Sequence, residues 1–306
     1  MHYLAVLNRD GGTLRTMDLD VFCAEARTIF EAHHHTLDCR IVAGDEIEDV
    51  LRKAATTPGI DVILAGGGDG TISSAAAIAF ESKIPLAVLP AGTMNLFART
   101  LKVPLDLHEA LQAIASGEMA SVDIATSNGE PFVHQFSVGI HARLVRIRDN
   151  LTYRSRVGKM MASLRAISAA VIDPPRFEVE IVTPRGREKR TVSGISVSNN
   201  PFGEGHFPHA DTVDAGVLGV YIAAPMTTGE LARLTFDILL GNWHHSPTIS
   251  QEEVSQITLR FPKRKRSAHA VIDGELIKLE REVHIVLHPR ALKVVIPRKE
   301  ERAEAV

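Results

Sequence analysis

The sequence has 306 residues, of which 45% are hydrophobic and 23% are charged, and its formal net charge is −3. This length favours two domains, and this composition is typical of a globular protein with a full hydrophobic core. The small net charge excludes a general nucleic-acid-binding protein, which would need a strong basic excess.

The cysteine content and the lengths of the apolar runs indicate the cellular compartment in which we expect the protein. Two cysteines, Cys23 and Cys39, are too few for a disulfide framework, so we expect a reducing environment. The N-terminal MHYLAVLNRD lacks the basic segment and the long apolar run of a signal peptide. No stretch approaches the roughly 18 uninterrupted apolar residues of a membrane span. We therefore expect a cytoplasmic protein whose contact with a membrane, where it occurs, is peripheral.

Short apolar runs alternate with helix-like segments in the first 125 residues. The runs predict buried strands at residues 3–7, 39–43, 61–65 and 85–89, and the helices are expected at 21–33, 47–55 and 71–80. About twenty residues separate the last two strands, enough for one crossover helix, so these strands should be parallel. The alternation predicts that residues 1–125 form a doubly wound α/β domain.

Three loops that contain glycine follow strands of this sheet. They are NRDGGT (8–13), GGGDGT (66–71) and PAGTMN (90–95). Parallel strands place such loops at one sheet edge, where α/β domains bind ligands. Each loop could be only a tight turn, or its backbone N–H groups could receive phosphate oxygens beside a helix N-terminus. The convergence favours the phosphate site, with Asp69 as a holder of Mg²⁺ or as an anchor of the loop.

The pattern changes from residue 126, where short, often alternating segments are rich in β-branched residues. They lie at 132–140, 176–182, 190–198, 217–223, 256–261, 268–273, 275–279, 283–288 and 291–296. This pattern predicts that residues 126–300 form an antiparallel β-sandwich domain. Two helices are expected within it, at 159–172 and 228–242, and the final strand could return to the first domain.

Three motifs resemble the diacylglycerol kinase catalytic-domain family, which includes diacylglycerol, sphingosine and ceramide kinases and soluble bacterial lipid kinases. The motifs are GGDGT at 67–71, PAGTMN at 90–95 followed by Ala98 and Arg99, and VIDGE at 271–275. NAD kinases and phosphofructokinases carry strings similar to the first motif. The second motif is specific to the lipid kinases, and the order and spacing of all three cover most of the chain.

The resemblance implies an ATP-dependent kinase that transfers the γ-phosphoryl group to the hydroxyl of diacylglycerol or a related lipid alcohol. The cofactors would be ATP and Mg²⁺, and the partner would be a lipid at a membrane surface; a homodimer is possible. Asp273 would be the general base, and Asp69 and Asp123 would belong to the acidic network around Mg²⁺. The residues expected to bind the nucleotide are Asn8, Gly12, Gly67, Gly68, Asp69, Gly70, Thr71, Gly92, Thr93, Asn95 and Glu275.

Asp273 has a second interpretation, and the sequence also departs from the family. Asp-Gly between alternating strands is a strong type I′ hairpin signal, which is compatible with a catalytic carboxylate at the tip. The first loop lacks the family's proline and serine, Leu96 stands where an acidic residue is common, and Ala215 replaces a metal-binding aspartate. Two alternatives therefore stay open: a non-catalytic nucleotide- or lipid-binding regulator, and a soluble-substrate kinase of the NAD kinase type.

Basic and histidine-rich stretches have further interpretations. KRKR at 263–266 is either a solvated loop or a contact for anionic lipid. A second basic stretch could serve phosphate or a membrane; it contains Arg143, Arg146, Arg148, Arg154, Arg156 and Lys159. The histidines at 33–35 and 244–245 lack the spacing of a zinc site, and the first group suits the end of a helix.

Overall fold

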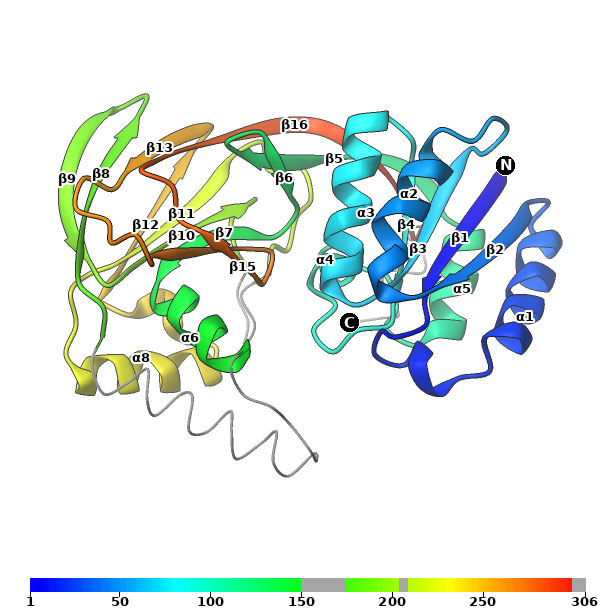
Figure 1. Cartoon of the computed structure of the whole chain (residues 1–306), viewed down its shortest axis with the longest axis horizontal. Helices are drawn as coiled ribbons and strands as arrows, with labels where there is room; N and C mark the ends of the chain where they lie inside the picture. Colours follow the sequence, from blue (N-terminus) through cyan, green and yellow to red (C-terminus); the bar gives the residue numbers. More distant parts are fainter. Residues whose placement is uncertain (150–173, 204–208, 299–306) are drawn as a thin grey trace.

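The computed structural model describes residues 1–149, 174–203 and 209–298. These residues form an N-terminal α/β domain followed by an antiparallel β domain, which confirms the predicted fold class (Figure 1). The long strands β5 (Glu118–Ser127) and β16 (Glu282–Ile296) cross from one domain to the other (Figure 1).

The first domain is built on parallel strands in the order β2-β1-β3-β4. They are β1 (His2–Asn8), β2 (Thr36–Val42), β3 (Val62–Gly67) and β4 (Leu86–Pro90). On one face α1 (Leu19–Ala32) contacts α5 (Leu107–Ala115), and on the other α2 (Ile47–Ala55) contacts α3 (Asp69–Ser82). Helices on both faces confirm the doubly wound arrangement, and β3 and β4 are parallel neighbours as predicted.

Local sequence explains where the helices begin and which face they bury. Asp18 caps α1 by accepting a hydrogen bond from the backbone N–H of Asp20. Phe22, Ala26 and Phe30 recur every four residues and are buried against the sheet, as an amphipathic helix requires.

The second domain adds two antiparallel layers. One sheet has the order β12-β11-β10-β7-β14-β15, and the other is the continuation β16-β13-β8-β9 of the first domain's sheet. The strands are β6 (Glu130–Phe132), β7 (Gln135–Gly139), β8 (Phe177–Thr183), β9 (Gly186–Val192), β10 (Gly194–Asn199), β11 (Leu218–Ala223), β12 (Ile249–Val254), β13 (Gln256–Arg260), β14 (His269–Ile272) and β15 (Glu275–Lys278). Phe136 and Val197 of one sheet share a buried core with Ile181 and Leu259 of the other, so the layers form the predicted sandwich.

The structure differs from the sequence-based expectations at several positions of the second domain. The expected strand at 132–140 is divided between β6 and β7, because the chain turns at residues 133–134. The expected strand at 190–198 is divided between β9 and β10 around Ser193. The basic stretch after β7 begins with a helix, α6 (Ile140–Asp149), which the sequence analysis did not anticipate.

The helix expected at 228–242 is α8 (Thr228–Leu239), and the helix expected at 159–172 lies outside the described residues. A short 3₁₀ helix (Trp243–His245) follows α8. Within the described ranges, every helix is too short or too polar to cross a bilayer.

The last strand belongs to both domains. The two strands expected at 283–288 and 291–296 form a single strand, β16, with an irregular register between His288 and Leu292. Its first half pairs with β13 in the sandwich, its second half touches β4, and β5 pairs with parts of both halves. Leu292, Val294 and Ile296 pack in the core of the first domain. The boundary at residue 125 stays a prediction, but the first core includes this C-terminal strand.

Leu292→Ala should lower the free energy of unfolding by about 2–5 kcal/mol, because it removes a fully buried side chain from the first core. Urea unfolding followed by circular dichroism would measure the change. Lys293→Ala is the matched control, since that neighbouring side chain is exposed and its loss should cost about 0.5 kcal/mol at most. Equal effects of the two substitutions would contradict the shared core.

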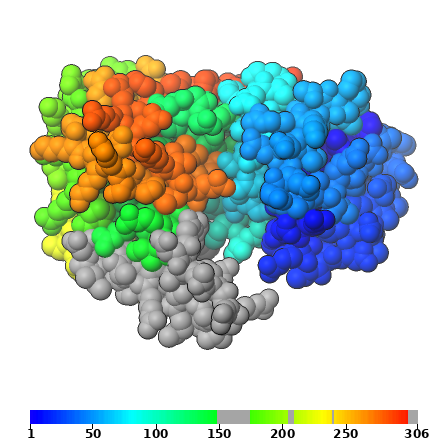
Figure 2. Space-filling model, viewed as in Figure 1, coloured from blue at the N-terminus to red at the C-terminus, as the bar shows by residue number. Residues whose placement is uncertain are grey.

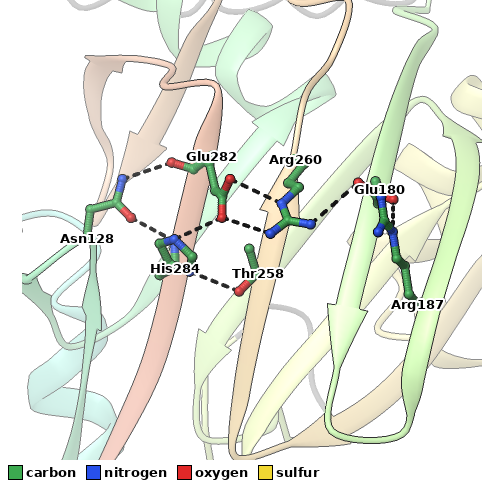
Figure 3. A network of polar contacts seen from close by, with 7 residues as sticks. All are labelled: Asn128, Glu180, Arg187, Thr258, Arg260, Glu282 and His284. Atoms are coloured by element: carbon green, nitrogen blue, oxygen red, sulfur yellow. Dashed lines mark hydrogen bonds and ion pairs between the residues drawn. The ribbon is translucent and has the colours of Figure 1, made fainter.

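A polar network covers the face of β8, β13 and β16 that points away from the sandwich core (Figure 3). Arg260 lies at its centre, with Nε 3.1 Å from a Glu282 oxygen and Nη1 3.8 Å from a Glu180 oxygen. Arg187 also hydrogen-bonds Glu180, and this contact lowers the pKa of the Glu180 carboxyl. The network joins neighbouring strands through their side chains, and none of the predicted site residues takes part in it.

Candidate active site

The loops after β1, β3 and β4 meet at the carboxyl edge of the parallel sheet, as predicted. The side-chain amide of Asn8 donates a hydrogen bond to the hydroxyl of Thr71 over 3.0 Å. The backbone N–H of Thr13 donates to the carbonyl of Ala91 over 2.9 Å. The first loop therefore contacts both of the others directly.

Glycine is required where these loops touch. A β-carbon on Gly12, whose φ is +42°, would lie 1.7 Å from the carbonyl oxygen of Ala91. A β-carbon on Gly92 would lie 2.7 Å from the Cα of Gly68. Packing between loops therefore explains these two glycines without any ligand.

The N-terminus of α3 offers a different environment. Gly68 is its N-cap residue, directly after Gly67 at the end of β3, and no side chain of the described residues caps the helix. The first hydrogen bond of the helix runs from the N–H of Ile72 to the carbonyl of Gly68. The N–H groups of the first turn therefore remain suited to an anion. A β-carbon on Gly68 would find only one neighbour within 4 Å, at 3.7 Å, so this glycine faces open space.

Asp69 anchors the neighbouring loop. Its carboxylate accepts hydrogen bonds from the backbone N–H groups of Asn95, over 3.0 Å, and Leu96, over 2.7 Å, at the start of α4 (Leu96–Thr100). The Asn95 side chain in turn bridges the N–H and the carbonyl of Gly92. Of the two sequence-based interpretations of Asp69, this geometry supports the anchor. Thr93 lies exposed in the same loop.

Asp123 is buried in β5 and also serves backbone groups. Its carboxylate accepts from the N–H of Gly216 and the N–H of Arg290, each over 2.8 Å. Within the described ranges, no three His, Cys, Asp or Glu side chains are grouped so that they could hold a metal ion. The metal roles of Asp69 and Asp123 stay predictions.

Asp273 and Gly274 form the tip of the hairpin between β14 and β15. Both have positive φ, +46° and +88°, and Ile272 pairs with Glu275 across the turn. This is the two-residue loop with left-handed backbone that Asp-Gly predicts. The hairpin carries both predicted C-terminal site residues to the first domain.

The Asp273 carboxylate is buried and accepts four hydrogen bonds. Three come from the backbone N–H groups of Val133, His134 and Gln135, over 2.9, 2.9 and 3.0 Å. The fourth comes from the hydroxyl of Ser73 on α3, over 2.7 Å. Two carboxylate oxygens offer about four lone-pair positions, so the donors in place fill them.

Burial raises the pKa of Asp273, while the hydroxyl of Ser73 and the three backbone N–H groups oppose this shift. A raised pKa makes the carboxylate a stronger base. Because Ser73 is the one side chain among the four donors, its bond can be exchanged by a simple rotation.

Glu275 lies against the first turn of α3. A β-carbon on Gly70 would come within 2.9 Å of a Glu275 carboxylate oxygen. The contact between Asp273 and Ser73 is close by on the same helix. Figure 2 shows the orange atoms of the second domain meeting the blue and cyan atoms of the first domain. The structure therefore brings the glycine-rich loops and the hairpin tip together.

Two residues of this region were not identified from the sequence. Ser73 had no motif of its own, and its contact with Asp273 spans 200 positions of the chain. His134 lies in the turn whose backbone binds Asp273, and burial lowers the pKa of its ring to about 4, an effect that Asp69 opposes and His209 reinforces. Neither contact has a local sequence signal, because each joins segments that are far apart in the chain.

The depressed pKa of His134 should make the protein less stable in mild acid. The unfolded chain takes up a proton near pH 6.5, whereas the folded ring resists protonation until about pH 4. The free energy of unfolding should therefore fall by up to about 3 kcal/mol as the pH drops from 6.5 to 4. Urea unfolding of wild type and His134→Gln over this range would isolate this contribution; parallel curves would contradict it.

The other singled-out residues lie outside this region or outside the described chain. Ring nitrogens of His33 and His244 bond the carbonyls of Ile29 and Gly203, so these histidines serve backbone groups. Among the basic residues, Arg143, Arg146 and Arg148 lie on α6. The remaining predicted positions, Arg154, Arg156 and Lys159, lie outside the described residues.

Comparison with known proteins agrees with this fold. The solved structure of a diacylglycerol kinase from Bacillus anthracis superposes with a TM-score of 0.70 at 17% identity, covering 98% of this chain and 97% of that one. A second solved chain from this organism gives a TM-score of 0.74 at 21% identity, with 98% of each chain covered. At these identities the likeness shows the fold, including the arrangement of both domains.

Sequence relatives are distant but extend over most of the chain. The diacylglycerol kinase of Bacillus subtilis is 22% identical over 84% of this chain and 86% of its own length. The protein sll0036 of Synechocystis is 26% identical over 78% of this chain, which spans about half (55%) of that relative. A probable YegS-like lipid kinase of Yersinia pestis is 35% identical over 28% of this chain and 31% of its own length.

A family model matches the part of the chain that carries the glycine-rich loops. The model describes the diacylglycerol kinase catalytic domain, and the match covers residues 2–127. This range includes β1 to β5 and the first two of the three motifs. Over these residues the chain is therefore similar to the catalytic domain of diacylglycerol kinases.

Proposed function

We propose that the protein is an ATP-dependent lipid kinase, which transfers the γ-phosphoryl group of ATP to the hydroxyl of diacylglycerol or a related lipid alcohol. The observation that carries the proposal is the buried Asp273 carboxylate, held by Ser73 at the α3 N-terminal turns. The raised pKa of this carboxylate and its position beside a helix N-terminus suited to phosphate support a role as the base.

The protein would contribute to this reaction mainly by positioning ATP and the lipid hydroxyl. The ATP phosphates would lie at Gly68 and the first turn of α3, and the lipid hydroxyl would enter beside Asp273. Asp273 would take the proton of that hydroxyl as its oxygen forms a bond to the γ-phosphorus. The bond from this phosphorus to the bridging oxygen would break, and ADP would leave.

Mg²⁺ would supply charge neutralisation on the phosphates, as it does in other kinases. Asp69 and Asp123 each accept two backbone N–H groups, which leaves each carboxylate about two lone-pair positions, so either could supply a ligand while ATP and water supply the others. Mg²⁺ commonly keeps several waters and is bound through few protein ligands, so this limited donor set fits it.

Ser73 is a positioning residue in this proposal. Ser73→Ala should lower kcat about tenfold, because the Asp273 carboxylate would lose the side-chain donor that orients it toward α3. A tenfold change corresponds to about 1.4 kcal/mol on the barrier. It should also move the acid limb of the kcat–pH profile to higher pH, because the Ser73 hydrogen bond lowers the pKa of Asp273. Ser74→Ala is the matched control from the next position of α3. A lower kcat without a shifted pH profile would contradict this prediction and would indicate that Ser73 has only a structural role.

One observation favours a second function, a nucleotide-binding protein without transfer activity. The four donors on Asp273 leave no free lone pair for a substrate proton until one of them moves. Isothermal calorimetry that detects ATP binding, together with no turnover in any assay, would support this function.

The direct test is phosphoryl transfer from γ-labelled ATP with Mg²⁺ and mixed detergent–lipid micelles. The acceptors should include diacylglycerol, a sphingoid base, ceramide and, as a soluble acceptor, NAD. Label in a lipid would support the proposal and identify the acceptor class. Label in NAD alone would favour the soluble-substrate kinase, and label in no acceptor would overturn both kinases.

A further inference from the structure

A cavity of about 810 Å³ lies in the second domain, at the end of β7 and α6. The loop at 261–268, which includes KRKR, forms one wall, and residues 174–178 form another. Its volume is in the range of sites for small molecules. The proposed phosphoryl transfer uses none of these residues.

The charge of the cavity is strongly one-sided. Its described lining includes six cationic side chains: Arg143, Arg146, Arg176, Lys263, Arg264 and Lys265. Among the described lining residues, Glu178 is the only carboxylate, and Lys263 pairs with it over 2.6 Å. Such an excess of cations around one hollow favours an anionic ligand.

Two lining residues have buried polar atoms that lack partners. Nε and Nη1 of Arg264 are buried and have no hydrogen-bond partner among the described residues. The same is true of Nδ1 of His269. Buried donors on a permanent charge are costly when unpaired, so an unpaired guanidinium edge in a cavity calls for a ligand. A phosphate can accept two parallel N–H bonds from such an edge.

The deeper wall of the cavity is apolar. Val138, Phe261 and Leu279 are buried core residues of the sandwich that also line the cavity, with Phe177 beside them. Cations at the opening and core side chains below suit a molecule with an anionic head and a hydrocarbon chain.

The cavity is separate from the reacting carboxylate. His269, at the start of β14, lines the cavity, whereas Asp273 follows the other end of this strand. Four residues of strand span roughly 13 Å. A three-carbon glycerol unit is much shorter, so a phosphate at His269 cannot belong to a glycerol whose hydroxyl is at Asp273.

We infer that this cavity is a binding site for an anionic phospholipid, with the phosphate at Arg264 and His269 and an acyl chain against Phe177 and Phe261. Neutral lipid alcohols would gain nothing from the cations. Occupation of this site would hold the second domain at an anionic membrane surface. The site stands on its own contacts and does not depend on the proposed kinase activity.

Calorimetry on the full chain tests the site with three probes: monomeric dihexanoyl phosphatidic acid, dihexanoylglycerol and inorganic phosphate. We expect the phosphatidic acid to bind once per chain, and the other two to bind much more weakly. Arg264→Gln should weaken this binding about tenfold, since charged hydrogen bonds contribute roughly 1.5–3 kcal/mol. Arg266→Gln, in the same loop but outside the described lining, should leave it unchanged.

Each other outcome overturns the inference. Equal losses in Arg264→Gln and Arg266→Gln would indicate general surface charge. Equal affinity for inorganic phosphate would indicate an anion site without an acyl pocket, and equal affinity for dihexanoylglycerol would indicate the acceptor site. Asp273→Asn should bind the phosphatidic acid as wild type does. Thermal unfolding of Arg264→Gln checks that the variant is folded. Its Tm should not fall below that of wild type, because the substitution removes an unpaired buried charge.

Discussion

Asp273→Asn is expected to lower phosphoryl transfer to lipid by about 10²- to 10⁴-fold, the range for loss of a general base. The amide is nearly isosteric with the carboxylate but cannot take the substrate proton. It also presents an NH₂ donor to a site that holds four donors, among them Ser73 and the N–H of Val133. The measurement is the initial rate of label transfer from γ-labelled ATP at saturating lipid.

Controls must separate lost chemistry from lost fold. The donor–donor conflict should cost about 1–3 kcal/mol of stability, so urea unfolding and ATP calorimetry should accompany the rates. Asp214→Asn is the matched control, because this exposed carboxylate contacts the Arg290 side chain, at 3.5 Å, and takes no part in the hydrogen bonds of Asp273. A variant that is folded, binds ATP and transfers phosphate at a rate near wild type would remove Asp273 from the mechanism.

Gly68→Ala should raise the Kd for ATP at least about tenfold, or about 1.4 kcal/mol, while the fold is retained. The backbone at Gly68 is extended, with φ −82° and ψ 179°, and its β-carbon would meet no atom closer than 3.7 Å. The added methyl group would therefore fit the protein but occupy the space through which phosphate approaches the α3 N–H groups. Calorimetry with ATP and Mg²⁺ measures the change.

Substitutions of two other glycines serve as controls for Gly68→Ala. Gly92→Ala should weaken both binding and stability, by about 1–3 kcal/mol for the latter, because its β-carbon would meet backbone at 2.7 Å. Gly229→Ala in α8 should leave ATP binding unchanged, since a β-carbon there meets open space. If Gly68→Ala binds ATP as well as Gly229→Ala does, the phosphates do not lie at the start of α3.

The first domain was predictable because its signals are local. Apolar runs of five residues separated by amphipathic helices predicted the parallel order of β3 and β4, and the order placed three loops at one edge. The Asp273–Gly274 turn was equally predictable, since left-handed backbone at two successive positions selects these residue types. Loop convergence and hairpin geometry thus followed from short-range chemistry.

The carboxylate contacts were not predictable, because they depend on packing between distant segments. Asp69 could hold a metal or anchor a loop by sequence, and only the position of the Leu96 N–H identifies the anchor. Ser73 and His134 gained their relation to Asp273 when the hairpin met α3 and the turn before β7. A family resemblance identifies the motif positions, but these partners lie between motifs.

Because β16 belongs to both domains, it affects the order in which the protein can fold during synthesis. Leu292 to Ile296 complete the core of a domain whose other strands lie before residue 128. Because synthesis adds about 5–20 residues per second, we expect the first domain to complete its core only after β16 has left the ribosome. The emerging β4 edge would stay unpaired until then, a stage at which chaperones are needed most.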